Sequence, residues 1–174
     1  MELNSVHTEQ DHLRQAKRNE DFSKFILRHD RKGEFSDWYS TAVFYSAVHY
    51  IEATFHILGP VLRLVAKGVD IQIVIRHSEI LNDDSLRDLV ARIFDKNTAH
   101  SVRMKILKQN DTLGTLYEKY SAIYSTVQSG RYNFMNPNQY DPVSIGKCLN
   151  ELIEECQKLT KVKVDRVLSK QNLK

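Results

Sequence analysis

The chain of 174 residues has the length of one domain, and its 41% hydrophobic and 27% charged residues exclude wholesale disorder. Its 3 prolines and 6 glycines are few, which favours helices over a turn-rich all-β fold. A net charge of +3 permits an anionic partner such as RNA but does not require one. No apolar run reaches membrane-spanning length, and residues 1–20 are polar rather than typical of a signal peptide. A cytoplasmic protein without a membrane partner is therefore expected.

Two long helices are predicted in the first third of the chain. Residues 5 to 28 carry a thin apolar stripe at three- and four-residue spacing, with charged side chains elsewhere. After a loop with Gly33, Ser36 or Asp37 is the expected N-cap of a second helix, which Gly59 and Pro60 end. Apolar residues cover more than one face of this second helix, which predicts a position at the centre of a bundle.

The segment after Pro60 gives a weaker pattern. From residue 69 to 77, β-branched residues recur at alternate positions, as in a strand: Val69, Ile71, Ile73 and Ile75. The sequence offers no evident partner strand, so a β-like segment and a strained helix both stay open. Residues 82 to 94 begin with good N-cap residues and continue with helical apolar spacing, which predicts a short helix.

Three further helices are predicted, at residues 100 to 108, 112 to 130, and from Pro142 to about 168. Asp141 and Pro142 have the residue types of an N-cap and a first helical position. Cys148 and Cys156 are eight residues apart on the last helix, about 12 Å along its axis, which is too far for a disulfide. The expected architecture is a single all-α domain over residues 1–174.

The second helix carries a polar stripe, because offsets of three, four and seven residues keep His49, Glu52 and His56 on one side. Imidazole and carboxylate are competent zinc or iron ligands. However, His49 and His56 lie two turns apart, about 10 Å, and no other helix offers matching ligands, so neither a metal site nor a cofactor is predicted. Two interpretations stay open: a polar cleft shared with His100 and Arg103, or a structural hydrogen-bond network.

The first two predicted helices contain the stretches 12-HLRQAKRN-19 and 37-DWYSTAVFYSAVHYIEA-53. These resemble the patterns H-L-x-Q-A-x-x-N and D-W-x-x-x-A-x-F-Y-x-A-x-H-Y-x-E-A of a widespread prokaryotic group of HEPN-domain proteins. An H-x-x-R segment and an A-R-Y-like element of the same group correspond here to 100-HSVR-103 and 130-GRY-132. The resemblance covers most of the chain except about residues 60–98, which look like an insertion.

The resemblance implies an up-and-down helical bundle with an inserted segment at about 60–98, usually assembled as a homodimer. It also implies binding of RNA or a nucleotide, and metal-independent endoribonuclease activity in a toxin–antitoxin or antiviral defence system, with a cognate antitoxin or defence-system partner. The alternative is a catalytically inactive HEPN-like module that binds a nucleotide or a protein partner. The usual catalytic signature of the family, Arg followed by four to six residues and His, does not occur in this chain.

Cleavage of RNA without a metal ion needs an acid–base group of near-neutral pKa and a cation for the developing phosphorane charge. His100 and Arg103 are the candidate catalytic residues, since a spacing of three places them on one helix face. Further candidates for the cleft or for RNA binding are Asn97, His49, Glu52, Tyr45 and Arg131. The alternative interpretation is that Arg103 pairs with an acidic residue and His100 caps its helix.

Aromatic and basic residues elsewhere leave two questions open. Tyr117, Tyr120 and Tyr124 have the residue type that stacks on bases, but their helical spacing favours core packing. The basic segment 158–174 is either a solvated helix end or a patch that contacts phosphates.

Overall fold

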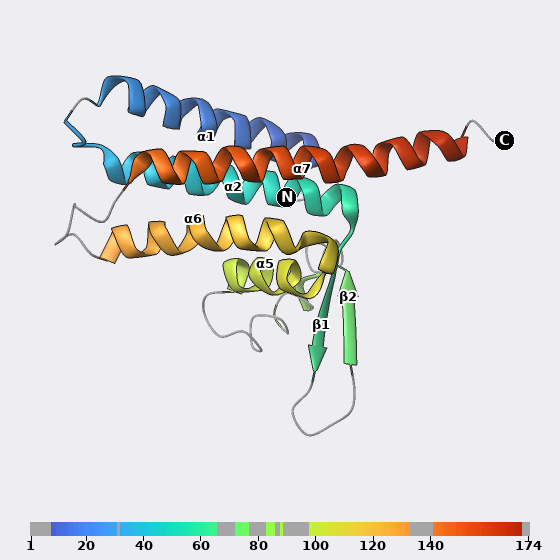
Figure 1. Cartoon of the computed structure of the whole chain (residues 1–174). Coiled ribbons are helices and arrows are strands. Elements are labelled where there is room, and N and C mark those ends of the chain that lie inside the picture. The colour runs from blue at the N-terminus through green and yellow to red at the C-terminus, as the bar shows by residue number, and fades with distance from the viewer. Residues whose placement is uncertain are drawn as a thin grey trace, which may run out of the picture.

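The computed structural model describes residues 8–30, 32–65, 72–76, 83–85, 88, 98–132 and 141–171. Its elements, in chain order, are α1 (Glu9–His29), α2 (Ser36–Leu58), β1 (Val61–Val65), β2 (Gln72–Arg76), α5 (Thr98–Gln109), the 3-10 helix η1 (Asp111–Leu113), α6 (Gly114–Tyr132) and α7 (Pro142–Gln171). The four long helices α1, α2, α6 and α7 lie side by side, and the short α5 lies along α6 (Figure 1). The predicted all-α helical bundle is therefore confirmed. Among the described helices, none combines the length and the apolarity that crossing a bilayer requires.

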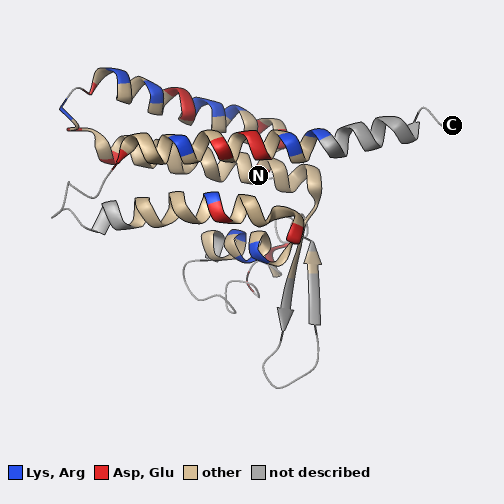
Figure 2. Ribbon diagram, viewed as in Figure 1, with Lys and Arg blue, Asp and Glu red and all other residues tan. Residues whose placement is uncertain are grey.

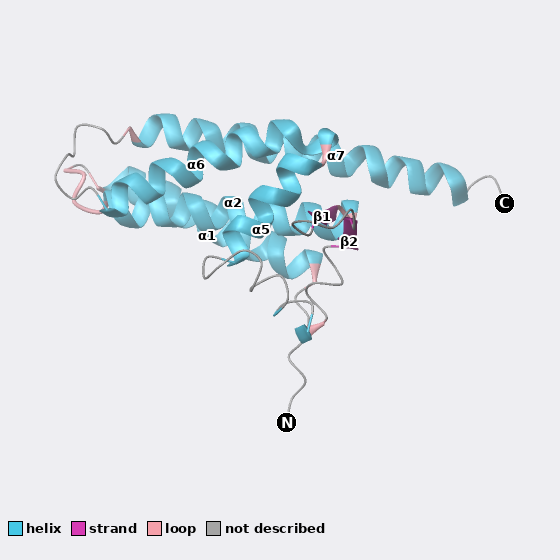
Figure 3. Ribbon diagram, turned by 90° about the horizontal axis from the view of Figure 1, so that it is seen from below, coloured by secondary structure: helices cyan, strands magenta, loops and turns pink. Residues whose placement is uncertain are grey.

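Helix α2 is the centre of the bundle, as its apolar pattern predicted. It packs against α1, α6 and α7, and the view from below places α6 and α7 on one side of it (Figure 3). Its side chains buried on these sides include Val43, Phe44, Ala47, Ile51 and Phe55. Since α1 covers another face of α2 than α6 and α7 do, polar residues on this helix meet different partners according to the direction in which they point.

A buried carboxylate helps to hold α1 against α2. Glu20 of α1 accepts a hydrogen bond of 3.0 Å from the Tyr50 hydroxyl of α2, and it also pairs with Lys17 and Lys24. Burial, the largest single effect, opposes ionisation of Glu20, but the hydrogen bonds from Lys24, Lys17 and Tyr50 together lower its pKa. Glu20 is therefore a charged group with its partners in place, and this contact fixes the position of α1 along α2.

The start of α2 differs from the prediction that Ser36 or Asp37 caps it. Ser36 is already the first helical residue, and the N-cap position is Phe35, which has no side-chain cap. Instead the carboxylate of Asp30, just after α1, accepts hydrogen bonds from the backbone N–H groups of Glu34 (2.9 Å) and Phe35 (2.8 Å). These donors belong to the two residues before the helix, so Asp30 holds the connection that leads into α2, and neither Ser36 nor Asp37 occupies the N-cap position.

The other predicted helix boundaries agree more closely with the structure. Gly59 has φ 61° in the left-handed region and ends α2 as predicted. The Asp141 carboxylate accepts a hydrogen bond of 2.9 Å from the Val143 N–H at the start of α7. Both cysteines on α7 are free thiols, and burial raises the pKa of the Cys156 thiol to about 12.

Part of the segment after Pro60 forms a β-hairpin that projects from the helices (Figure 1). Strand β2 lies within the predicted strand region, and its antiparallel partner is β1, which the sequence analysis did not identify. Leu62 of β1 lies opposite Ile75 of β2, and both are buried. The Asn110 amide anchors the hairpin by donating a hydrogen bond of 3.1 Å to the Val61 carbonyl. The short helix predicted at residues 82 to 94 falls mostly outside the described residues.

The close approach of α7 to α2 at Gly146 gives a testable consequence. A Cβ atom at Gly146 would lie 2.6 Å from the hydroxyl oxygen of Tyr39, which is 5% exposed and donates to the Pro142 carbonyl. We expect Gly146→Ala to lower the free energy of unfolding by about 1–3 kcal/mol in urea denaturation, despite the higher helix propensity of alanine. In a Tyr39→Phe background the same substitution should be neutral or stabilising, since the obstructing oxygen is gone. Equal losses in both backgrounds would contradict this explanation.

Candidate functional site

The polar stripe of α2 divides between two neighbouring helices. Glu52 points toward α5 and forms an ion pair with Arg103. His49 and His56 instead meet His12 of α1: the His12 ring centroid lies 5.4 Å from that of His49 and 5.3 Å from that of His56. Of the two interpretations left open for the stripe, the cleft shared with His100 and Arg103 therefore applies to Glu52 alone, and His49 and His56 belong to a separate polar cluster.

The first cluster connects α2, α5 and α6 around Arg103. The guanidinium Nε of Arg103 donates to Glu52 Oε1, and its Nη1 lies 3.2 Å from Nδ1 of His100. The same Nδ1 lies 3.3 Å from the hydroxyl oxygen of Tyr120. The Glu52 side chain is 6% exposed and that of Arg103 is 15% exposed. Arg103 is therefore largely withdrawn from solvent and held between a carboxylate and an imidazole.

These contacts fix the tautomer of His100. Since a guanidinium can only donate hydrogen bonds, Nδ1 of His100 is the acceptor, and the proton of the neutral ring lies on Nε2. Burial raises the pKa of Tyr120 to about 12 although Arg103 opposes this shift, so Tyr120 keeps its proton at neutral pH. His100 in this arrangement is a hydrogen-bond donor through Nε2 rather than a ready base.

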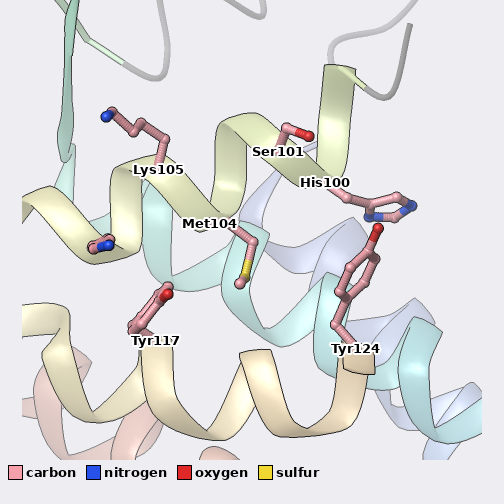
Figure 4. Close-up of a pocket in the computed structure, with 7 residues that line it drawn as sticks. His100, Ser101, Met104, Lys105, Tyr117 and Tyr124 are labelled. Atoms are coloured by element: carbon pink, nitrogen blue, oxygen red, sulfur yellow. The ribbon is translucent and has the colours of Figure 1, made fainter. Parts of the chain in front are cut away.

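Aromatic side chains hold the His100 ring in place. The ring centroid of Phe44, from α2, lies 5.0 Å from that of His100, and the centroid of Tyr124, from α6, lies 5.8 Å away. The hydroxyl end of Tyr124 points toward the imidazole (Figure 4). Contacts on several sides restrict the rotamers of His100, so its orientation is set by the core.

A pocket between α5 and α6 begins at this imidazole. We call it the His100 pocket; it encloses about 320 Å³ and is lined by His100, Ser101, Met104, Lys105, Lys108, Tyr117 and Tyr124. Met104 extends from α5 toward α6, with Tyr117 and Tyr124 on either side of it (Figure 4). The size is at the lower end of the range for small-ligand sites, which is about 300–1,000 Å³.

Two lysines make this pocket cationic. Lys105 and Lys108 are exposed, and a spacing of three places them on one face of α5. Neither lysine has an ion-pair partner among the residues that the structure describes. Figure 2 shows the basic residues along the ribbon of α5, the short helix beside α6. The pocket thus combines ammonium groups, a hydrogen-bonding imidazole and two aromatic rings.

Tyr45, Asn97 and Arg131 are the remaining candidate residues from the sequence. Tyr45 is 42% exposed and is not among the residues that line the His100 pocket. Asn97 lies outside the described residues, and the side chain of Arg131, near the end of α6, is not described either. The catalytic assignment of His100 and Arg103 stays a prediction, although Arg103 does form the acidic ion pair that was its alternative interpretation.

Sequence reasoning did not assign Ser101, Met104, Lys105 or Lys108 to a site. A signal existed in the spacing, because the lysines are three residues apart on α5 and the tyrosines seven apart on α6. Tyr120 is fully buried, whereas Tyr117 and Tyr124 are only partly buried. Core packing, favoured by the spacing, therefore holds for Tyr120, while Tyr117 and Tyr124 pack against the edge of the core and also border the pocket.

The second cluster, of His12, His49 and His56, does not have the arrangement of a metal centre. His12 contacts the other two rings, which lie about 10 Å apart along α2. In the part of the chain that the structure describes, no group of three or more histidine, cysteine, aspartate or glutamate side chains is placed to hold a metal ion.

Comparison with known proteins adds no identification to this geometry. No protein-family model, curated protein or solved structure matches the chain.

Proposed function

We propose that the chain is a cytoplasmic RNA-binding protein and that the His100 pocket is its binding site. The observation that carries this proposal is the meeting of Lys105, Lys108 and His100 with the rings of Tyr117 and Tyr124 in one pocket. Proteins that bind single-stranded nucleic acid combine cationic groups along the backbone with aromatic rings on which bases stack. The HEPN resemblance favours RNA or a nucleotide as the ligand that carries these phosphates and bases.

The spacing of the side chains suits a strand that follows the helices. Tyr117 and Tyr124 are two turns apart on α6, about 10 Å along its axis, so each ring can meet a different base. Lys105 and Lys108 lie across the pocket on α5, where their ammonium groups can contact phosphates. His100, which carries its proton on Nε2, can add a donor to a phosphate oxygen.

Metal-independent cleavage of RNA is the second candidate function. The observation that favours it is the position of the His100 imidazole at the pocket, with Arg103 and Tyr120 on its Nδ1. In this account Arg103 is a positioning residue, since it reaches the pocket through His100 rather than lining it. A neutral imidazole is too weak an acid to give up its Nε2 proton, and its Nδ1 lone pair is occupied. Cleavage therefore requires His100 to exchange its partners, so that Nδ1 is freed to act as a base.

Photo-cross-linking tests the proposed site. A short single-stranded RNA containing 4-thiouridine is irradiated with the full chain, and the modified peptides are identified by mass spectrometry. We expect adducts at Tyr117 and Tyr124 that disappear with excess unmodified RNA, because stacked rings lie in direct contact with bases. Adducts confined to other segments, or none, would overturn the assignment of the pocket.

The same reactions, run with EDTA and without irradiation, separate binding from cleavage. Shortened RNA with wild-type protein but not with His100→Ala would support the second candidate. Intact RNA, or equal cutting by the variant, would leave binding as the function and reject cleavage by His100. EDTA excludes a contaminating metal-dependent nuclease as the source of cutting.

Partners in the proposed function come from the resemblance. The resemblance implies a homodimer, with a second copy of this chain as the partner. It also implies a cognate antitoxin or another defence-system protein. Large apolar side chains are exposed on α1 and near the start of α2, which supports a protein partner that covers them. They are Phe22, Phe25, Phe35 and Trp38.

A further inference from the structure

A second pocket lies between α1 and α2, beside the histidine cluster. We call it the α1–α2 pocket; it encloses about 240 Å³ and is lined by Asp11, His12, Arg14, Gln15, Arg18 and His49. The α1 residues recur at spacings of three and four, so they form one face of the helix. His49 of α2 completes the pocket, while Phe44 and Glu52 of the same helix face α5. Helix α2 therefore separates this pocket from the His100 pocket.

The charges of the α1–α2 pocket favour an anion. Asp11, its carboxylate, pairs with Arg14 at 3.0 Å and accepts a hydrogen bond from the Thr8 backbone N–H at 2.9 Å. Arg18 is exposed and has no ion-pair partner among the described residues. With one carboxylate against two guanidinium groups, the pocket keeps a net positive charge before its histidines are counted.

The two histidines of the pocket are in direct contact. Nδ1 of His12 lies 3.0 Å from Nδ1 of His49, so one of these atoms donates and the other accepts. Both imidazoles line the pocket together with Arg18. Guanidinium and imidazole donors of this kind are the groups that bind phosphate oxygens in proteins.

We propose that the α1–α2 pocket binds a phosphate group, and that it is a second backbone contact for the RNA held at the His100 pocket. The second part of this inference rests on the proposed function, whereas phosphate binding itself does not. Arg18 supplies the bidentate charged contact, and His12 and His49 supply neutral or charged donors. The source of the phosphate is RNA in this account, and a free phosphate ion has the same chemistry.

The experiment compares Arg18→Gln with Arg28→Gln, which also removes an exposed positive charge from α1 but lies outside the pocket. Inorganic phosphate is titrated at constant ionic strength while the histidine ring signals are followed by NMR, and His12→Gln assigns them. We expect His12 and His49 signals to shift, with an apparent Kd raised about three- to tenfold by Arg18→Gln and less than twofold by Arg28→Gln. A fluorescein-labelled single-stranded RNA, followed by anisotropy, should show the same order of affinities.

The outcomes distinguish the two proposals. Absence of histidine shifts with phosphate, or equal effects of the two substitutions, would overturn the phosphate site whatever the RNA result. Phosphate binding without RNA binding would keep the site and reject RNA as its ligand, together with the proposed function. If Arg18→Gln and Arg28→Gln bind RNA with the same affinity, the His100 pocket stays the proposed RNA site and the α1–α2 pocket is rejected as a second contact.

Discussion

Replacing Glu52 by leucine is expected to lower the free energy of unfolding by about 3–5 kcal/mol, because it leaves the Arg103 guanidinium buried without its carboxylate. Arg103→Met should cost a similar amount, since it leaves the Glu52 charge at 6% exposure without a partner. The double substitution Glu52→Leu, Arg103→Met removes both charges and should lie within about 2 kcal/mol of the wild type. Urea unfolding monitored by circular dichroism gives the three values.

A surface ion pair on α1 is the matched control for this experiment. Arg14 pairs with Asp11 at 3.0 Å, and the two side chains are 70% and 39% exposed. Arg14→Met should therefore change the stability by less than about 0.5 kcal/mol, because water screens this pair. If Glu52→Leu is as mild as Arg14→Met, the Glu52–Arg103 pair is accessible to water and Arg103 is available to a ligand. A large loss of stability, the expected result, means that Arg103 has a structural role and holds α5 and His100 in place.

Much of the helical frame could be predicted because its signals are local. The apolar periodicity of α2, its end at Gly59 and the start of α7 at Asp141 and Pro142 each depend on neighbouring residues alone. The N-cap of α2 could not be predicted in this way, since Asp30 holds the two residues before the helix across a turn and α2 begins without a side-chain cap. Strand β1 was missed because a short apolar run such as 61-VLRLV-65 does not distinguish strand from helix.

The candidate site was predicted in part for a geometric reason. An offset of three residues leaves Glu52 about 60° around the helix from His49, whereas His56 deviates from His49 by only about 20°. On a surface helix that difference is small, but α2 is packed on several sides, so 60° is enough to change the neighbour. Glu52 consequently meets Arg103 of α5, while His49 and His56 meet His12 of α1.

The His100 pocket could not be derived from the sequence because it depends on how α5 and α6 pack. Lys105 and Lys108 look like ordinary solvent-facing residues of an amphipathic helix. Tyr117 and Tyr124 look like part of the same apolar stripe as the buried Tyr120. The pairing of α5 with α6 brings the two sets together, and no local pattern specifies this pairing.

RNA affinity is expected to fall about 10- to 100-fold when Lys105 and Lys108 are both replaced by glutamine, because two phosphate contacts are lost. The slope of log affinity against log salt concentration should also decrease by about 2, one for each lysine. Both lysines are exposed, so the variant should fold and unfold like the wild type, which circular dichroism can verify.

Helix α7 offers a control of the same charge and spacing. Lys158 and Lys161 are also exposed and three residues apart, and they belong to the basic segment that was the alternative phosphate-binding patch. The decisive measurement is anisotropy of a labelled single-stranded RNA with Lys105→Gln, Lys108→Gln and with Lys158→Gln, Lys161→Gln at several salt concentrations. A large loss of affinity for the α5 variant and little change for the α7 variant is the predicted result. Equal losses, or a larger loss for the α7 variant, would contradict the His100 pocket as the RNA-binding site.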